Sequence, residues 1–117
     1  SKLSFYVHCR DMIGRHIAKY GVHEASITAW IAEALTASPA RGIVVDVGAN
    51  LGWHTVHAAQ YAAVDTVAAF EPDPFNAWLL NRNLAINKVT KAVVSVSAVG
   101  APGKADSTCR TAVTWSA

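Results

Sequence analysis

Residues 43–55 read IVVDVGANLGWHT, and this stretch decides the fold that the chain can adopt. Residues 43–47 are rich in β-branched side chains, which favour a buried strand. The glycines at positions 48 and 52 let the backbone turn tightly and come close to a ligand, because no Cβ stands in the way. The apolar, alanine-rich run from Trp53 to Val64 predicts a helix. A strand, a glycine loop and a helix N-terminus in this order are typical of a nucleotide-type cofactor site.

The rest of the chain continues the alternation of strands and helices. Residues 66–70 and 92–99 are predicted to be strands, and residues 75–87 a helix. Asp73 is a good N-cap for that helix, and Pro74 suits its first turn. The resulting order, β-α-β-α-β, predicts an α/β fold with a Rossmann-like parallel sheet and right-handed crossovers. Residues 41–117 are therefore expected to form part of a Rossmann-like domain.

The N-terminal residues 1–40 are predicted to form a helical cap that packs against the sheet. One apolar stripe with helical spacing supports this prediction; it consists of Ile27, Trp30, Ile31, Ala34 and Leu35. Residues 3–9 alternate weakly between apolar and polar side chains, which indicates a short strand. Residues 108–115 are expected to form a final strand. The four tryptophans are interpreted as core or packing residues rather than stacking platforms.

Composition excludes several classes of protein. With 52% hydrophobic and 15% charged residues among 117, the chain is globular rather than disordered. A net charge of +2, with no cluster of lysines and arginines, argues against a nucleic-acid partner. No apolar run approaches about 18 residues and no signal peptide is evident, so we expect neither a membrane span nor secretion. Cys9 and Cys109 form no CxxC pair, which favours a reduced, cytoplasmic protein; a single bridge between them is the alternative.

The loops that follow the first two predicted strands carry the polar residues of a cofactor site. Carboxyl ends of parallel strands meet at one edge, so residues 46–52 and 71–73 should converge on one crevice. Glu71 can accept hydrogen bonds from ribose hydroxyls, a feature shared by NAD, FAD and S-adenosylmethionine (AdoMet) sites. Dinucleotide sites use a G-x-G-x-x-G loop, whereas this loop carries Asn50 at its middle position. Asp46 would repel a pyrophosphate but suits a sulfonium ligand with an ammonium group.

Two motifs in this region resemble those of the FkbM-like family of AdoMet-dependent methyltransferases. Residues 45–55 are similar to its first motif, and residues 70–74 with Asn76 and residues 79–84 to its second. The resemblance covers most of residues 11–103, because it also includes Asp11, Gly21, Glu24 and residues 97–100.

This resemblance implies a role for each matching residue. The methionine part of the cofactor would be lined by Asp46, Gly48, Asn50 and Gly52. The ribose would be held by Glu71, and the adenine would lie beside Pro72 and Asp73. Glu24 would close over the methionine end. Nothing in the sequence requires a metal, and the residues that catalyse methyl transfer stay unassigned.

The chain departs from the family after Gly103. The family continues with a fourth strand that bears an Asp-x-Glu-Gly segment, and then with strands that build the acceptor pocket. We therefore expect the cofactor-binding portion of a methyltransferase, and specifically of an O-methyltransferase for a small-molecule or glycan acceptor. Two alternatives stay open: a fragment of an NAD-dependent oxidoreductase, and a non-catalytic Rossmann-like binding or assembly module. Without the fourth strand, the free edge of strand 43–47 predicts self-association, unless residues 3–9 or 108–115 cover it.

The histidines offer a weaker signal. His54 and His57 are spaced i, i+3 on the predicted helix, a spacing that can hold a metal. No third ligand is evident from the sequence, and His23 has no ligand spacing. We therefore interpret these histidines as satisfied or solvent-facing and predict no metal site.

Overall fold

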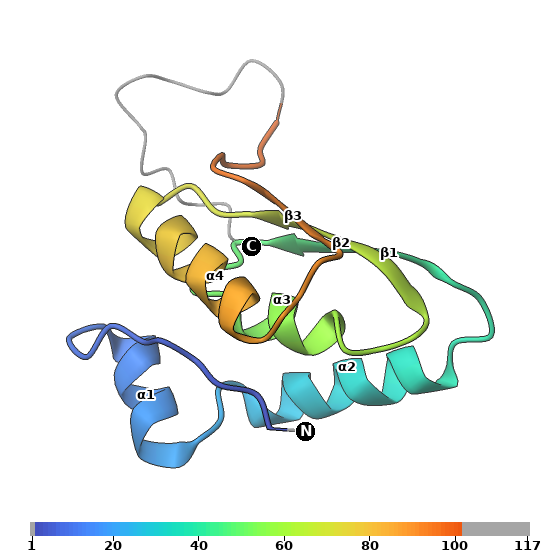
Figure 1. Cartoon of the computed structure of the whole chain (residues 1–117), viewed down its shortest axis with the longest axis horizontal. Coiled ribbons are helices and arrows are strands. Elements are labelled where there is room, and N and C mark those ends of the chain that lie inside the picture. The colour runs from blue at the N-terminus through green and yellow to red at the C-terminus, as the bar shows by residue number, and fades with distance from the viewer. Residues whose placement is uncertain (1, 102–117) are drawn as a thin grey trace.

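A three-stranded parallel sheet lies at the centre of the computed structural model, which describes residues 2–101 (Figure 1). Its strands lie in the order β1-β2-β3 and comprise β1 (Gly42–Val47), β2 (Val64–Phe70) and β3 (Ala92–Ser95). The predicted α/β fold with a Rossmann-like parallel sheet is confirmed. Strand β3 ends four residues before the predicted position, and the predicted strand 108–115 lies outside the described residues.

Four helices accompany the sheet: α1 (Met12–Tyr20), α2 (Ala25–Ala37), α3 (Trp53–Ala58) and α4 (Pro74–Ile86). Figure 1 shows α2, α3 and α4 on the same side of the sheet. Helix α3 is much shorter than the predicted run to Val64. The chain turns after Ala58, where Tyr61 N–H donates to the Ala58 carbonyl at 3.3 Å, and enters β2 at Val64 opposite Gly42. None of the helices within residues 2–101 is long and apolar enough to cross a bilayer.

The two faces of the sheet differ sharply in burial. On the face toward the helices, Val67 and Ala69 are fully buried. Ala69 packs with Val56 and Leu80, and Val67 packs with Ala58. On the other face, Val45, Ala68 and Val93 lie side by side in register. Val45 and Val93 are 60% and 63% exposed. The core therefore lies between the sheet and its helices, which places the strand ends and the first turn of α3 in well-packed surroundings.

The N-terminal segment is extended but is not a strand, so the prediction for residues 3–9 is wrong. Its partner is helix α4 instead of a sheet. Asn83 accepts from Tyr6 N–H at 2.6 Å and donates to the Tyr6 carbonyl at 3.1 Å. Asn87 forms the same pair of bonds with Ser4, at 2.8 and 2.7 Å. Four residues of helix rise about 6 Å and two extended residues span about 6.6 Å, so the two asparagines match alternate residues of the segment.

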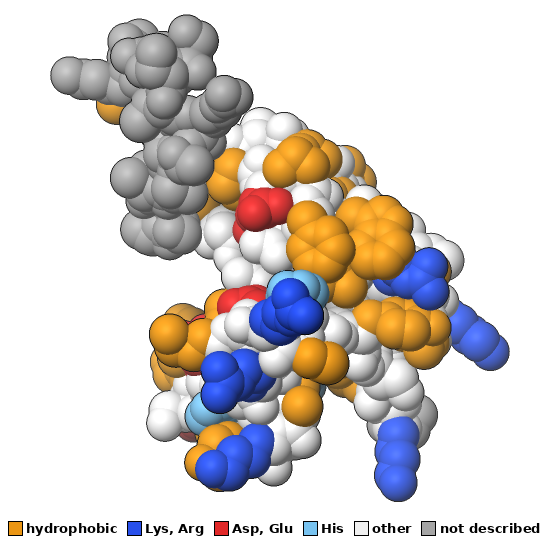
Figure 2. Space-filling model, turned by 90° about the vertical axis from the view of Figure 1, so that its left-hand side faces the viewer, with side chains coloured by type: hydrophobic (Ala, Val, Ile, Leu, Met, Phe, Trp, Pro, Cys, Tyr) orange, Lys and Arg blue, Asp and Glu red, His pale blue; other side chains and the backbone are white. Residues whose placement is uncertain are grey.

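The tryptophans show where the packing prediction holds and where it is wrong. Trp53 is only 6% exposed and belongs to the core. Trp30 is 67% exposed, so its predicted place in a buried stripe is wrong. Trp78 is 53% exposed and packs at the surface against Phe75 and the guanidinium of Arg82. Figure 2 shows the side of the molecule that is on the left in Figure 1. Hydrophobic side chains gather in its middle and upper part, and Lys and Arg side chains lie below them and to their right.

The asparagine contacts allow a direct test of what holds the N-terminal segment. Asn83 is fully buried and also donates to the Leu51 carbonyl at 2.7 Å. We expect Asn83→Ala to lower the free energy of unfolding by about 1–3 kcal/mol for each buried group left unpaired. Asn87→Ala should cost less, because its bonds to Ser4 lie in the solvent. Urea denaturation measures both; equal losses would contradict the buried role of Asn83.

The free edge of β1 supports the predicted self-association, which we propose takes place through a second copy of this chain. Within residues 2–101, β1 pairs only with β2, so its outer edge leaves backbone groups unpaired beside the exposed Ile43 and Val45. We expect Val45→Lys to shift the protein toward the monomer in sedimentation velocity. The matched control is Ile27→Lys, which changes an exposed residue of α2. A parent chain that sediments as a monomer at high concentration would refute the proposal.

Candidate functional site

The loop between β1 and α3 uses its backbone N–H groups within the protein. All five backbone N–H groups of residues 48–52 donate hydrogen bonds of 2.8–3.0 Å within the protein. Gly48 and Ala49 donate to the Phe70 carbonyl, and Gly52 donates to the Ala49 carbonyl. Asn50 donates to Glu71 Oε1, and Leu51 donates to Asn50 Oδ1. A dinucleotide loop must turn such groups toward a pyrophosphate. The glycine loop of this chain is instead held against the end of β2.

Glu71 joins the two predicted motifs. Its side chain is nearly buried, at 5% exposure, and both carboxylate oxygens are used. Oε1 accepts from Asn50 N–H and Oε2 from Asp73 N–H, each at 2.8 Å. The loop after β1 and the loop after β2 therefore meet at one carboxylate, as predicted from the strand ends. Each oxygen keeps a second lone pair that can accept from a ligand hydroxyl.

Three loop residues have positive φ angles: Gly48 (76°), Asn50 (53°) and Gly52 (96°). At Gly52 an added Cβ would also lie 2.4 Å from the Leu80 side chain. Backbone angle and packing therefore suffice to require glycine at position 52. Asn50 is one of the few non-glycine types that adopt this conformation readily. The structure thus explains the spacing of the loop without a ligand, and the role of these residues in cofactor binding stays a prediction.

Asp46 is a largely buried carboxylate at the end of β1. Its Oδ2 accepts from the Thr55 hydroxyl at 2.5 Å, and Thr55 is fully buried in the first turn of α3. Burial raises the pKa of Asp46, and the hydrogen bond from Thr55 opposes that shift. Within residues 2–101, Asp46 and His54 are the ionisable residues that line a pocket of about 270 Å³ between α2, β1 and α3; its other lining residues are Trp30, Ile31, Ala34, Leu35, Val44, Val45 and Ala58. A carboxylate whose pKa is raised by burial and that lines a pocket is a candidate ligand-binding group.

Asp73 begins helix α4 as predicted. Its Oδ1 accepts from the N–H groups of Phe75 at 2.8 Å and Asn76 at 3.3 Å, and Pro74 is the first helical residue. Asp73 N–H also donates to Glu71, so this capping residue is fixed at the crevice. The positions of Pro72 and Asp73 beside an adenine stay predictions.

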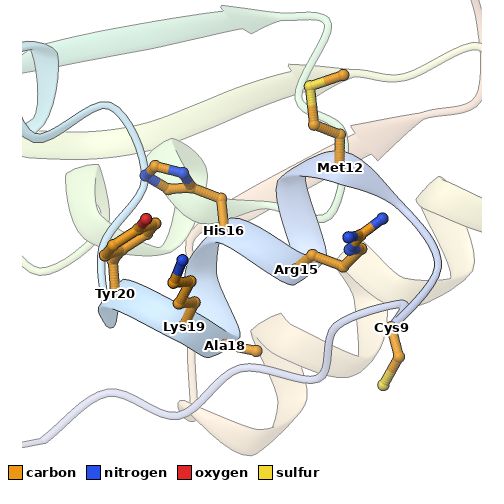
Figure 3. Close-up of a pocket in the computed structure, with 7 residues that line it drawn as sticks. All are labelled: Cys9, Met12, Arg15, His16, Ala18, Lys19 and Tyr20. Carbon is orange, nitrogen blue, oxygen red and sulfur yellow. The ribbon is translucent and has the colours of Figure 1, made fainter.

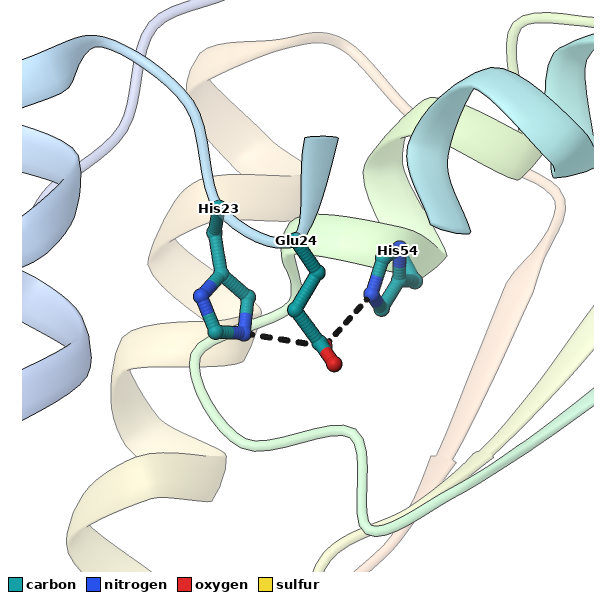
Figure 4. Close-up of side chains that lie close together, drawn as sticks. All are labelled: His23, Glu24 and His54. Atoms are coloured by element: carbon teal, nitrogen blue, oxygen red, sulfur yellow. Dashed lines mark hydrogen bonds and ion pairs between the residues drawn. The ribbon is translucent and has the colours of Figure 1, made fainter. Parts of the chain in front are cut away.

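Glu24 lies in a contact that the sequence did not indicate. Its Oε1 is 3.0 Å from Nε2 of His23 and 3.0 Å from Nε2 of His54 (Figure 4). The hydrogen bond with His54 lowers the pKa of Glu24, while burial lowers the pKa of His23 against the opposing charge of Glu24. His54 is therefore hydrogen-bonded, which fits its interpretation as a satisfied histidine, but the sequence did not indicate Glu24 as its partner. No spacing rule could have found this group, because His54 lies 30 residues after Glu24. The two residues meet only through the packing of α2 on α3.

His57 is a hydrogen-bonded histidine, which fits its interpretation as satisfied or solvent-facing. One ring nitrogen lies 2.7 Å from the Trp53 carbonyl, and the ring stacks on Phe5 with 5.7 Å between centroids. Burial lowers the pKa of His57. The contact with the Trp53 carbonyl satisfies Nδ1 of the ring.

A second hollow, of about 670 Å³, surrounds helix α1 but brings no chemical groups together. Figure 3 shows its lining side chains pointing away from α1 in different directions; they are Cys9, Met12, Arg15, His16, Ala18, Lys19 and Tyr20. A binding site needs polar groups that converge on one point. The ends of β1 and β2, where the two loops meet at Glu71, are therefore the better candidate.

Comparisons with known proteins agree on the fold. No protein-family model and no curated protein matches the sequence. The structure is similar to that of M. jannaschii TYW2 in complex with AdoMet, with a TM-score of 0.51, 26% identity, and coverage of 67% of this chain and 35% of TYW2. It is also similar to precorrin 8W decarboxylase from Methanobacterium thermoautotrophicum, with a TM-score of 0.57 and 18% identity over 78% of this chain and 44% of that protein.

Coclaurine N-methyltransferase bound to N-methylheliamine and SAH is a third similar structure. Its TM-score is 0.51, with 19% identity over 62% of this chain and 21% of the enzyme. This chain therefore spans less than half the length of each of the three proteins. At these identities, the likeness to the decarboxylase and to the N-methyltransferase shows a shared Rossmann-like fold.

The buried carboxylate of Asp46 predicts a pH-dependent stability. Because burial raises its pKa above the ordinary value of 3.8, the folded protein holds this proton more tightly than the unfolded chain does. The resulting stabilisation is present below about pH 3.8 and is lost as the pH rises through the raised pKa. Asp46→Asn removes the titration and keeps an oxygen acceptor for Thr55. We expect its melting temperature to exceed that of the parent at pH 7, with the difference shrinking toward pH 4.

Thermal melts across this pH range make the measurement, and Glu33→Gln provides the control at an exposed carboxylate on α2. A difference between Asp46→Asn and the parent that stays constant from pH 4 to pH 7 would show that Asp46 titrates as a solvated group.

Proposed function

We propose that this chain binds AdoMet at the carboxyl ends of β1 and β2 and forms the cofactor-binding part of a methyltransferase. The observation that carries the proposal is the pair of hydrogen bonds by which Glu71 joins Asn50 to Asp73. These bonds bring together the two motifs that resemble those of AdoMet-dependent enzymes. The likeness to TYW2, which was solved in complex with AdoMet, supports the same proposal.

The glycine loop favours AdoMet over a dinucleotide. Because the N–H groups of residues 48–52 all donate within the protein, the loop does not present them to a pyrophosphate. The nearby carboxylate of Asp46 would repel phosphate groups but would attract the positive charge of a sulfonium or ammonium. These two features are the physical argument against the alternative of an NAD-dependent oxidoreductase.

The contacts of each proposed cofactor residue are compatible with a role in binding the cofactor. Asp46 would face the positively charged methionine end, lined also by Gly48, Asn50 and Gly52. Glu71 would accept from the ribose hydroxyls with the lone pairs that its backbone contacts leave free. Pro72 and Asp73 would lie on the adenine side. The role of Glu24 at the methionine end stays a prediction, since its carboxylate already contacts two imidazoles.

The bound cofactor would supply an electrophilic methyl group on a sulfonium. In the transfer we propose, an acceptor hydroxyl oxygen forms the new C–O bond as the C–S bond breaks in line. The C–S electron pair stays on the sulfur of S-adenosylhomocysteine, the leaving group, and the hydroxyl proton passes to solvent. The residues of this chain would contribute by fixing the methionine and ribose parts, because positioning is a large share of such catalysis. An O-methyltransferase of the FkbM-like kind, acting on a small-molecule or glycan acceptor, is the specific form of the proposal. The motif resemblance supports it, and a cytoplasmic setting is part of the same proposal; Cys109, the alternative bridge partner of Cys9, lies outside the described residues.

Calorimetric titration with S-adenosylhomocysteine, and separately with NADH, tests the proposal. We expect the parent to bind S-adenosylhomocysteine and not NADH. Glu71→Gln should raise its dissociation constant at least about tenfold, because a hydrogen bond to a charged group contributes about 1.5–3 kcal/mol. Glu33→Gln makes the same chemical change at an exposed site on α2 and should bind as the parent does.

The possible results separate the alternatives. Unchanged affinity in a folded Glu71→Gln protein would remove Glu71 from the ribose site. Binding of NADH alone would favour the oxidoreductase, and binding of neither compound would favour an assembly module. Circular dichroism of each variant shows whether a loss of affinity comes from loss of the fold.

A further inference from the structure

Three potential metal ligands from two separate elements converge beside the first turn of α3. His23 and Glu24 directly precede α2, and His54 is the second residue of α3. Each side chain offers one ligand atom, and these atoms all lie within 4.8 Å of one another. Figure 4 shows the carboxylate of Glu24 between the two imidazole rings. Two imidazoles and one carboxylate form a ligand set that binds zinc-class ions in proteins.

The distances are close to those that an ion requires. Glu24 Oε1 is 3.0 Å from Nε2 of each histidine. Two metal–ligand bonds of about 2.0–2.2 Å at a tetrahedral angle separate the ligand atoms by roughly 3.3–3.5 Å. Small rotations of exposed side chains therefore suffice to admit an ion between them.

Neighbouring residues fix the two ligand-bearing segments against each other. The Thr28 hydroxyl donates to the His23 carbonyl at 3.0 Å, and Thr28 N–H donates to the Glu24 carbonyl at 2.9 Å. The same hydroxyl accepts from the indole N–H of Trp53, the residue before His54, at 3.0 Å. Trp53 is almost fully buried, so the start of α2 is anchored to the start of α3. Supporting contacts of this kind hold ligands in place before an ion binds.

Solvent can reach the group. The side chains of His23, Glu24 and His54 are 20%, 42% and 22% exposed. An ion can enter from the surface, and three protein ligands leave one tetrahedral position for water. The alternative account is that Glu24 only accepts hydrogen bonds from two imidazoles. Nδ1 of His54 has no partner among the described residues in either account, so it does not decide between them.

We propose that His23, Glu24 and His54 form a binding site for one divalent ion of the zinc class. The site does not rest on the proposed function, because its test measures ion binding without AdoMet. It would make Glu24 a metal ligand at the rim of the cofactor crevice.

The full chain, freed of metal with a chelator, is titrated with Zn²⁺ in competition with a chromogenic chelator. We expect one ion per chain. His23→Ala and Glu24→Gln should each weaken binding at least about tenfold, since even the partners that support a ligand contribute that much. His8→Ala removes an exposed histidine outside the group and should bind as the parent does.

Co²⁺ then reports the ligand type. We expect an absorption spectrum of nitrogen and oxygen ligands that changes in His23→Ala and not in His8→Ala. A thiolate-to-cobalt band would place the ion on a cysteine and overturn the proposal. Equal affinity in the parent and a folded His23→Ala protein, or no binding by the parent, would overturn it too. Glu24→Gln preserves side-chain size, so its result stands if His23→Ala fails to fold.

Discussion

The carboxylate of Glu71 is the contact on which the proposed cofactor site depends. It is nearly buried, and its two oxygens accept from Asn50 and Asp73 across the gap between two loops. Hydrogen bonds to a buried carboxylate are stronger than those between neutral groups. Without them the glycine loop would keep its contacts with the Phe70 carbonyl but lose its link to the start of α4. One acidic side chain thus sets the position of the residues proposed to hold the cofactor.

The sequence predicted the sheet well because local and long-range preferences agree there. The β-branched run of β1 forms a strand as predicted, although its residues are half-buried or exposed and not buried as expected. Asp73 and Pro74 favour the start of a helix, where α4 begins. Parallel pairing then follows from the β-α-β order. The boundaries were less predictable: α3 ends at Ala58 because the chain must turn in time to pair Val64 with Gly42. Alanine-rich composition alone cannot show where such a turn falls.

Two contacts escaped prediction because the partner lies on a distant element. The alternation in residues 3–9 does reflect an extended chain, but Asn83 and Asn87 of α4 satisfy its backbone in place of a strand. Similarly, His23 and His54 share no local spacing, and Glu24 meets them only because α2 packs on α3. A period in the sequence reports the shape of one segment and carries no information about what lies opposite.

Trp53 connects these separate observations. Its ring lies 4.7 Å from that of Phe5 in the N-terminal segment, and its indole N–H holds Thr28 at the start of α2. Its backbone begins α3, directly after the glycine loop. The segments before the sheet are therefore fixed to the same residue that ends the loop, while Asp46 braces the first turn of α3 through Thr55. A ligand that moves this turn must also move the start of α2, so the cofactor crevice and the His23–Glu24–His54 group share one mechanical support.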